Sequence, residues 1–223
     1  RRFSLKRGVL IELQKRIPVA AGLGGGSSNA AATLLALQQW WHLPLSAEEM
    51  LSMAADLGSD VPFFLMGGLA LCEGRGERVA PLKPWWPASM RWLLLVKPDI
   101  SVSTAVVFSN LPKSDYTDGS HSRAVYTALQ NRQVPRLEDL HNGLERGVLA
   151  RYPEVVQARE AMLQAGATFV RLSGSGPTLF APFAELDHAA QAQQHLRTQG
   201  FDSYLTCARY PNKGQDSFYY MDV

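Results

Sequence analysis

The sequence predicts an α+β protein that is built in two parts. Hydrophobic residues make up 46% of the 223 residues and charged residues 19%, which is enough apolar surface for a folded core. In the first half, a glycine-rich turn at residues 22–26 runs directly into a helix with one apolar face. After residue 153 the order of elements is helix–strand–strand–helix–strand, which is typical of a ferredoxin-like layer.

Charge and composition exclude several classes of protein. The formal net charge is +2 and the basic residues are scattered, so we expect no nucleic-acid partner. No apolar run approaches the ~18 residues of a membrane helix, so we expect no membrane association. Cys72 and Cys207 form neither a zinc pattern nor a disulfide framework, and we expect both to be small buried residues. The histidines show no metal-ligand spacing.

The elements of the first part follow from hydrophobic period and capping residues. Alternation of apolar residues in 9–14 predicts a half-buried strand that Pro18 ends. Apolar residues three or four apart across 30–41 predict a helix, with Ser27 or Ser28 as its N-cap. A capping box of Ser46 and Glu49 starts a second helix, which ends at Gly58 and carries Met50, Ala54 and Leu57 on its apolar face. Strands are expected after it at 69–73, 77–82 and 91–97.

The second part contains more helix. Helices are expected at 123–130, 137–149, 153–165 and 185–199, and strands at 167–172, 178–181 and 201–208. The polar segment 111–122 is the best candidate for a mobile loop, and the pattern assigns nothing to the residues after 211. We therefore divide the chain into a first part at 1–98, a second part at 99–210 and a tail at 211–223.

The glycine-rich turn has the chemistry of an anion site. Glycines allow the backbone to approach a ligand closely, and the N–H groups and dipole of the following helix attract negative charge. A nucleotide phosphate chain is the natural ligand. A Walker A loop is excluded because no Lys precedes Ser27, and a Rossmann loop because Ser27 stands where its third glycine would be. The alternative is a turn that only packs a helix against a sheet.

Five segments resemble the GHMP kinases. These segments are Pro18–Ala31, Gly58–Phe64, Glu73–Glu77, His141–Glu145 and Leu172–Gly176. The first resembles the second motif of the family and the last resembles its third motif. The triple glycine before Ser27, together with Gly-Ser-Asp-Val-Pro-Phe-Phe at 58–64, is most similar to the branch of cytidyl-methylerythritol kinases.

This resemblance implies a fold, a reaction and a set of residues. The implied fold is the GHMP kinase fold, with a first part like ribosomal protein S5 domain 2 that binds ATP, and a ferredoxin-like second part. The implied reaction is ATP-dependent phosphorylation of an alcohol on a cytidine diphosphate-linked methylerythritol, with Mg²⁺, in the methylerythritol route to isoprenoids. The ATP-binding residues would be Pro18, Val19, Ala20, Ala21, Gly22, Leu23, Gly24, Gly25, Gly26, Ser27, Ser28 and Asn29.

Asp60 is the implied catalytic residue, which accepts or orients the proton of the acceptor hydroxyl. It lies between Gly58 and an apolar run, so we expect a partly desolvated carboxylate. An N-cap role in a short turn is the alternative. Ser27 or Ser28 would supply a hydroxyl to phosphate or to Mg²⁺, and Ser28 is the candidate metal ligand.

Two further segments are implied to bind substrate. Their residues are Thr104, Phe108, Ser173, Gly174, Ser175 and Gly176. Core packing is the alternative for Phe108, and an ordinary β-turn is the alternative for 173–176.

The chain departs from the family pattern at its start. The Lys-x-Asn motif of the family's first strand does not precede Val9, and no initiator Met is present, so we expect a truncated kinase whose activity is in doubt. A sheet edge left unpaired would favour association, and a monomer or a homodimer is expected. The alternatives are another GHMP kinase, of the homoserine or mevalonate type, and a non-catalytic nucleotide-binding homologue. The route implies a bacterial cytosol or a plastid.

Overall fold

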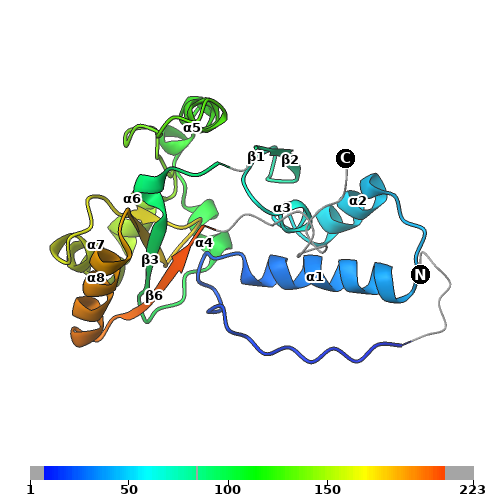
Figure 1. Cartoon of the computed structure of the whole chain (residues 1–223), viewed down its shortest axis with the longest axis horizontal. Helices are drawn as coiled ribbons and strands as arrows, with labels where there is room; N and C mark the ends of the chain where they lie inside the picture. The colour runs from blue at the N-terminus through cyan, green and yellow to red at the C-terminus, as the bar shows by residue number, and fades with distance from the viewer. Residues whose placement is uncertain (1–7, 84, 209–223) are drawn as a thin grey trace.

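The computed structural model describes residues 8–83 and 85–208, which fold into two parts (Figure 1). The first part contains three helices, α1 (Gly25–Trp40), α2 (Ala47–Leu57) and α3 (Val61–Met66), and a hairpin of β1 (Ala70–Glu73) and β2 (Arg78–Pro81). An extended arm, residues 8–17, runs beside α1 before the chain turns into the glycine-rich loop. The tail at 211–223 lies outside the described residues.

The three helices of the first part share a small core. Met50, Ala54 and Leu65 are completely buried there, and Ala31 and Val61 lie beside them. The predicted capping box of α2 is confirmed, because the Ser46 side chain accepts from the Glu49 N–H and the Glu49 carboxylate accepts from the Ser46 N–H. The prediction for Leu57 is wrong. Its side chain is 61% exposed, because the apolar face of α2 ends one turn earlier.

The second part is a four-stranded antiparallel sheet covered by helices. Its strands are β3 (Trp92–Lys97), β4 (Arg171–Leu172), β5 (Leu179–Phe183) and β6 (Asp202–Cys207), in the order β4-β5-β3-β6. Its helices are α4 (Thr104–Ser109), α5 (Ser120–Gln130), α6 (Glu145–Arg151), α7 (Pro153–Gln164) and α8 (Leu186–Thr198). The expected order after residue 153 is confirmed as α7-β4-β5-α8-β6, and β3 completes a ferredoxin-like βαββαβ unit.

Helices α7 and α8 pack against this sheet and form the larger core (Figure 1). Leu94 and Val96 of β3 are fully buried beneath Val155 and Met162 of α7 and Leu196 of α8. Glycines 166 and 200 follow the C-cap residues of the two helices and have positive φ, which is typical of a helix end.

β3 lies between β5 and β6, at the centre of this sheet. A division of the chain at residue 98 would assign β3 to the first part and separate it from its partners. We therefore propose that the boundary lies between β2 and β3.

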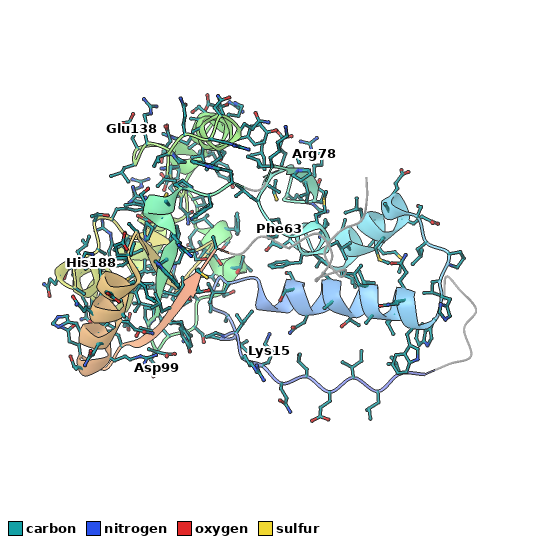
Figure 2. All side chains as sticks on the ribbon, in the orientation of Figure 1. Lys15, Phe63, Arg78, Asp99, Glu138 and His188 are labelled. Carbon is teal, nitrogen blue, oxygen red and sulfur yellow. The ribbon has the colours of Figure 1, made fainter. Side chains whose placement is uncertain are left out.

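The strand expected at 9–14 is wrong. These residues form no ladder with any described residue, and Leu10 is 95% exposed. A strand gains its hydrogen bonds from a neighbour, and alternation alone does not supply one. The side chains of the arm therefore project from an extended chain that no described strand covers (Figure 2).

Two predictions in the second part also need correction. The single helix expected at 137–149 is replaced by a turn and then by α6, because the Asn142 side chain accepts from the Leu144 N–H and stops a helix from starting earlier. The loop expected at 111–122 contains a short 3-10 turn at Lys113–Asp115 and the first residues of α5. Among the described helices, none is long and apolar enough to cross a membrane.

Candidate active site

The glycine-rich loop leads into the longest helix of the molecule through residues with left-handed backbone. Ala20, Gly22 and Gly24 have φ of 52°, 71° and 64°. Gly24 is the N-cap of α1, so the prediction that Ser27 or Ser28 caps this helix is wrong. The first N–H groups of an α-helix have no acceptor within it, so the start of α1 presents donors to a ligand.

The second glycine loop, residues 173–176, packs directly against the first. The Ser173 hydroxyl donates to the carbonyl oxygen of Gly22 over 2.8 Å. A Cβ on Gly22 would collide with the carbonyl of Ser173 and would lie 2.9 Å from that of Gly176. The structure thus brings together two predicted loops that are far apart in the sequence, and Gly22 is required at their contact.

The second loop also reaches the segment expected to hold substrate. The hydroxyls of Ser175 and Thr104 are 2.8 Å apart, and Ser175 is buried at 7% exposure. Thr104 begins helix α4, which the sequence analysis did not predict. Phe108, on the same helix, is 52% exposed, so core packing does not account for its ring.

Asp60 immediately precedes α3, at the N-cap position, and its side chain makes no capping hydrogen bond. It lines a cavity of about 390 Å³ together with Gly22, Gly24 and Ser173. The expectation of a partly desolvated carboxylate is wrong, because Asp60 is exposed. The apolar residues of α3 turn toward α1 and α2, which leaves the residue before them at the rim.

Aromatic and thiol groups form the remaining wall of this cavity. A Cβ on Gly24 would meet the ring of Phe64 at 2.5 Å, so the ring covers the loop closely. Cys72 also lines the cavity and is exposed, whereas a buried thiol was expected from the sequence. Desolvation by surrounding protein atoms, and then the charge of Asp60, raise the pKa of the Cys72 thiol, so it stays protonated at neutral pH.

Lys15 is a residue whose position the sequence analysis missed. A Cβ built on Gly25 would lie 3.3 Å from Nζ of Lys15, so its ammonium lies beside the first turn of α1. The feature of the sequence that could have indicated this position is that Lys15 stands three residues before Pro18, where the glycine-rich stretch opens. This charge adds to the helix dipole in favouring an anion.

The candidate metal ligand is compatible with Mg²⁺ but does not form a preformed cage. The Ser28 hydroxyl donates to the Gly25 carbonyl at 3.0 Å, which leaves its oxygen lone pairs free to coordinate. Within 8–83 and 85–208, no three His, Cys, Asp or Glu side chains form a metal-binding group. Mg²⁺ is commonly held by one or two protein ligands and by substrate phosphates, and a single Ser28 oxygen is compatible with such a site.

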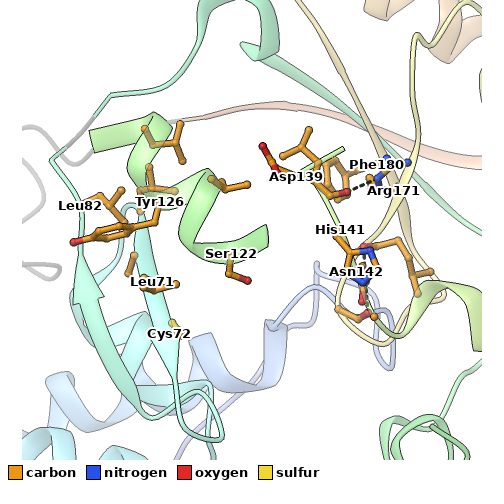
Figure 3. Close-up of a pocket in the computed structure, with 18 residues that line it drawn as sticks. Leu71, Cys72, Leu82, Ser122, Tyr126, Asp139, His141, Asn142, Arg171 and Phe180 are labelled. Atoms are coloured by element: carbon orange, nitrogen blue, oxygen red, sulfur yellow. Dashed lines mark hydrogen bonds between the residues drawn. The ribbon is translucent and has the colours of Figure 1, made fainter. Parts of the chain in front are cut away.

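A second cavity, of about 550 Å³, lies between the β1–β2 hairpin, α5 and the turn at 139–143 (Figure 3). Arg171 forms its far wall and donates to the carbonyls of Leu137 and Leu140, which fixes the turn. Asp139 lies in the same wall, and the guanidinium of Arg136 holds the pKa of that carboxyl below its usual range. Cys72 lines both this cavity and the cavity that contains Asp60.

Comparison with known families identifies this arrangement. A model of the GHMP kinases N terminal domain matches residues 1–68, and a model of the GHMP kinases C terminal matches 125–202. A 4-diphosphocytidyl-2-C-methyl-D-erythritol kinase of Alkaliphilus oremlandii is 38% identical over 205 residues, which are 92% of this chain and 70% of that protein. The chain belongs to the GHMP kinases.

Other GHMP kinases give the same picture. A kinase of the same name from Brevibacillus brevis is 42% identical over 81% of this chain, and the chain spans 61% of that relative. A crystal structure of 4-(cytidine 5'-diphospho)-2C-methyl-D-erythritol kinase superposes with a TM-score of 0.70 at 34% identity, and covers 86% of this chain and 68% of its own. Homoserine kinase from Cytophaga hutchinsonii, at 21% identity and a TM-score of 0.65, shares the fold.

Proposed function

We propose that the protein transfers the γ-phosphoryl group of ATP to the 2-hydroxyl of 4-diphosphocytidyl-2-C-methyl-D-erythritol, a step toward isoprenoid precursors. The observation that carries this proposal is the meeting of two glycine loops and Asp60 around one cavity. Relatives that are 38–44% identical carry the name of this kinase, which favours this acceptor over others.

Each part of the site has a role in phosphoryl transfer, which depends on positioning and on charge stabilisation. The N–H groups at the start of α1 and the ammonium of Lys15 attract the phosphates of ATP. Asp60 accepts the proton of the acceptor hydroxyl, or orients it, from the rim of the cavity. Mg²⁺, held by Ser28 and the phosphates, would neutralise developing charge.

The acceptor lies on the side of the second loop and α4. Ser173 lines the cavity and donates to the first loop, and Thr104 is hydrogen-bonded to the second loop through Ser175. The half-exposed ring of Phe108 offers a face on which a cytosine can stack. We assign Thr104 and Phe108 to the cytidine end of the substrate.

The decisive experiment measures ADP formation from ATP and Mg²⁺ with three acceptors: the cytidyl-methylerythritol, homoserine and mevalonate. We expect turnover with the first acceptor. Asp60→Asn should lower kcat by about 10²–10⁴-fold, since a positioned proton acceptor contributes that much. Asp56→Asn, the same charge change on the exposed face of α2, is the matched control and should keep full activity. Turnover of homoserine or mevalonate in preference to the first acceptor contradicts the proposal.

Nucleotide binding without turnover is the second candidate function. It is favoured by the surroundings of Asp60, which forms no ion pair with any Lys or Arg in the described part of the chain. Thermal stabilisation by ATP, with no ADP formed from any of the three acceptors, would support this reading.

A further inference from the structure

The Asn142 side chain is held by three hydrogen bonds. Its amide nitrogen donates to the carbonyl oxygens of Leu172, at 3.0 Å, and of Gly174, at 2.9 Å. Its carbonyl oxygen accepts from the Leu144 N–H at 3.0 Å. A flipped amide would place its oxygen against two carbonyls, so these contacts fix the orientation of the group.

Glu145, the first residue of α6, completes the attachment from the same turn. Its carboxylate accepts from the Leu172 N–H at 2.8 Å. Leu172 belongs to β4, which pairs with β5 on one side and forms the edge of the sheet on the other. The two side chains therefore take the place of a further strand and hold both backbone polar groups of Leu172.

The second glycine loop begins at the next residue, so this attachment extends to the active site. Ser173 donates to the Gly22 carbonyl, and Ser175 is bonded to Thr104. The carbonyl of Gly174, which Asn142 holds, lies between these two contacts in the sequence. A change at Asn142 thus alters the surface against which Gly22 packs.

We propose that Asn142 and Glu145 are positioning residues of the phosphotransfer site, which hold the second glycine loop so that the first keeps its nucleotide-binding shape. Neither side chain lines the cavity that contains Asp60. The structural part of this inference is independent of the proposed function, and its kinetic consequence rests on that function.

The test compares amide hydrogen exchange in four variants without any ligand. Asn142→Asp keeps the shape of the side chain but cannot donate, and Glu145→Ala removes the acceptor. Both should speed exchange in 172–176 and also at Thr178, whose N–H donates to the Ala21 carbonyl of the first loop. Glu145→Gln keeps an acceptor oxygen and should restore slow exchange. The matched control is Gln193→Glu on α8, where an amide also donates to a backbone carbonyl, that of Ser203 at 3.0 Å.

The outcomes separate this inference from the proposed function. Unchanged exchange at Thr178 in Asn142→Asp, or an equal change in Gln193→Glu, overturns the inference even if the kinase is active. With an active kinase, we expect Asn142→Asp to raise the KM for ATP by about tenfold, with Gln193→Glu unchanged. Wild-type chain without turnover would contradict the proposed function and leave the exchange result to decide the positioning role.

Discussion

Gly22 is the residue at which the two halves of the site meet. Its φ of 71° and the carbonyls of Ser173 and Gly176 leave no place for a side chain. A glycine is expected here from the sequence, because an anion loop needs close backbone approach. The sequence does not predict the contact with Ser173, which is 151 residues away.

Gly22→Ala should therefore destabilise the protein, by about 1–2 kcal/mol from the left-handed backbone alone. The collision with Ser173 adds to this loss and should also abolish thermal stabilisation by ATP. Urea unfolding measures the first effect. Gly147→Ala is the control, since a Cβ there meets nothing within 4 Å, and it should raise stability by about 0.5–1 kcal/mol in the interior of α6. Equal effects of the two changes would contradict the role of Gly22.

The roles of Asn142, Glu145 and Lys15 are harder to find from residues alone. Asn142 is joined to Gly174 across 32 positions, and Glu145 to Leu172 across 27. A hydrophobic pattern along the sequence reflects only contacts between neighbouring residues. It therefore led to one helix at 137–149, with Asn142 and Glu145 inside it. The sequence is enough to propose the loop residues and Asp60 as candidates for the site. The exposure of Asp60, by contrast, depends on how α3 packs.

At the scale of elements, helices and strands were predicted correctly where their own residues contain the capping residues or the apolar pattern that defines them. The capping box of α2, the glycines after α7 and α8, and the apolar run of β3 are complete within a few residues. α4 was missed because Thr104–Ser109 is short and rich in β-branched residues, which favour strands. Its start depends on Ser103, whose hydroxyl accepts from the Val106 N–H.

Removing the capping box tests how much the stability of α2 depends on the hydrogen bonds at its own N-terminus. Ser46→Ala should destabilise the protein by about 1 kcal/mol, because the Glu49 N–H loses its acceptor and water replaces it only in part. Ser52→Ala, on the exposed face of the same helix, is the control and should be neutral or slightly stabilising. Thermal unfolding of both variants measures the difference. A Ser46 variant as stable as the Ser52 variant would show that tertiary packing alone holds α2.

At the scale of the whole molecule, each half has its own core, and an uncovered arm runs beside the first. Leu10, Ile11 and Leu13 of the arm are 95%, 57% and 57% exposed. An extended segment with apolar side chains, whose backbone pairs with no strand among residues 8–83 and 85–208, is a template for pairing with another chain.

We therefore expect the chain to associate as its concentration rises, and Ile11→Lys to reduce this association. A charge on the arm opposes strand pairing between copies. Light scattering over a concentration series measures the effect. Leu186→Lys is the control, because Leu186 is 43% exposed on α8, away from the arm, and this change should leave association as it was. If both variants reduced association equally, the cause would be a general gain in solubility and not the loss of strand pairing at the arm.

The hydrogen bond from Ser173 to Gly22 also has a consequence for the order in which the chain folds. It joins residues 151 positions apart, so a long loop must close before it can form. The buried residues of the first core lie within 31–65 and those of the second within 94–196, so neither core includes this contact. We therefore expect the contact at Gly22 to form late, because it joins a residue that precedes the first core to a loop within the span of the second. On the proposed function, nucleotide binding would then report that folding is complete.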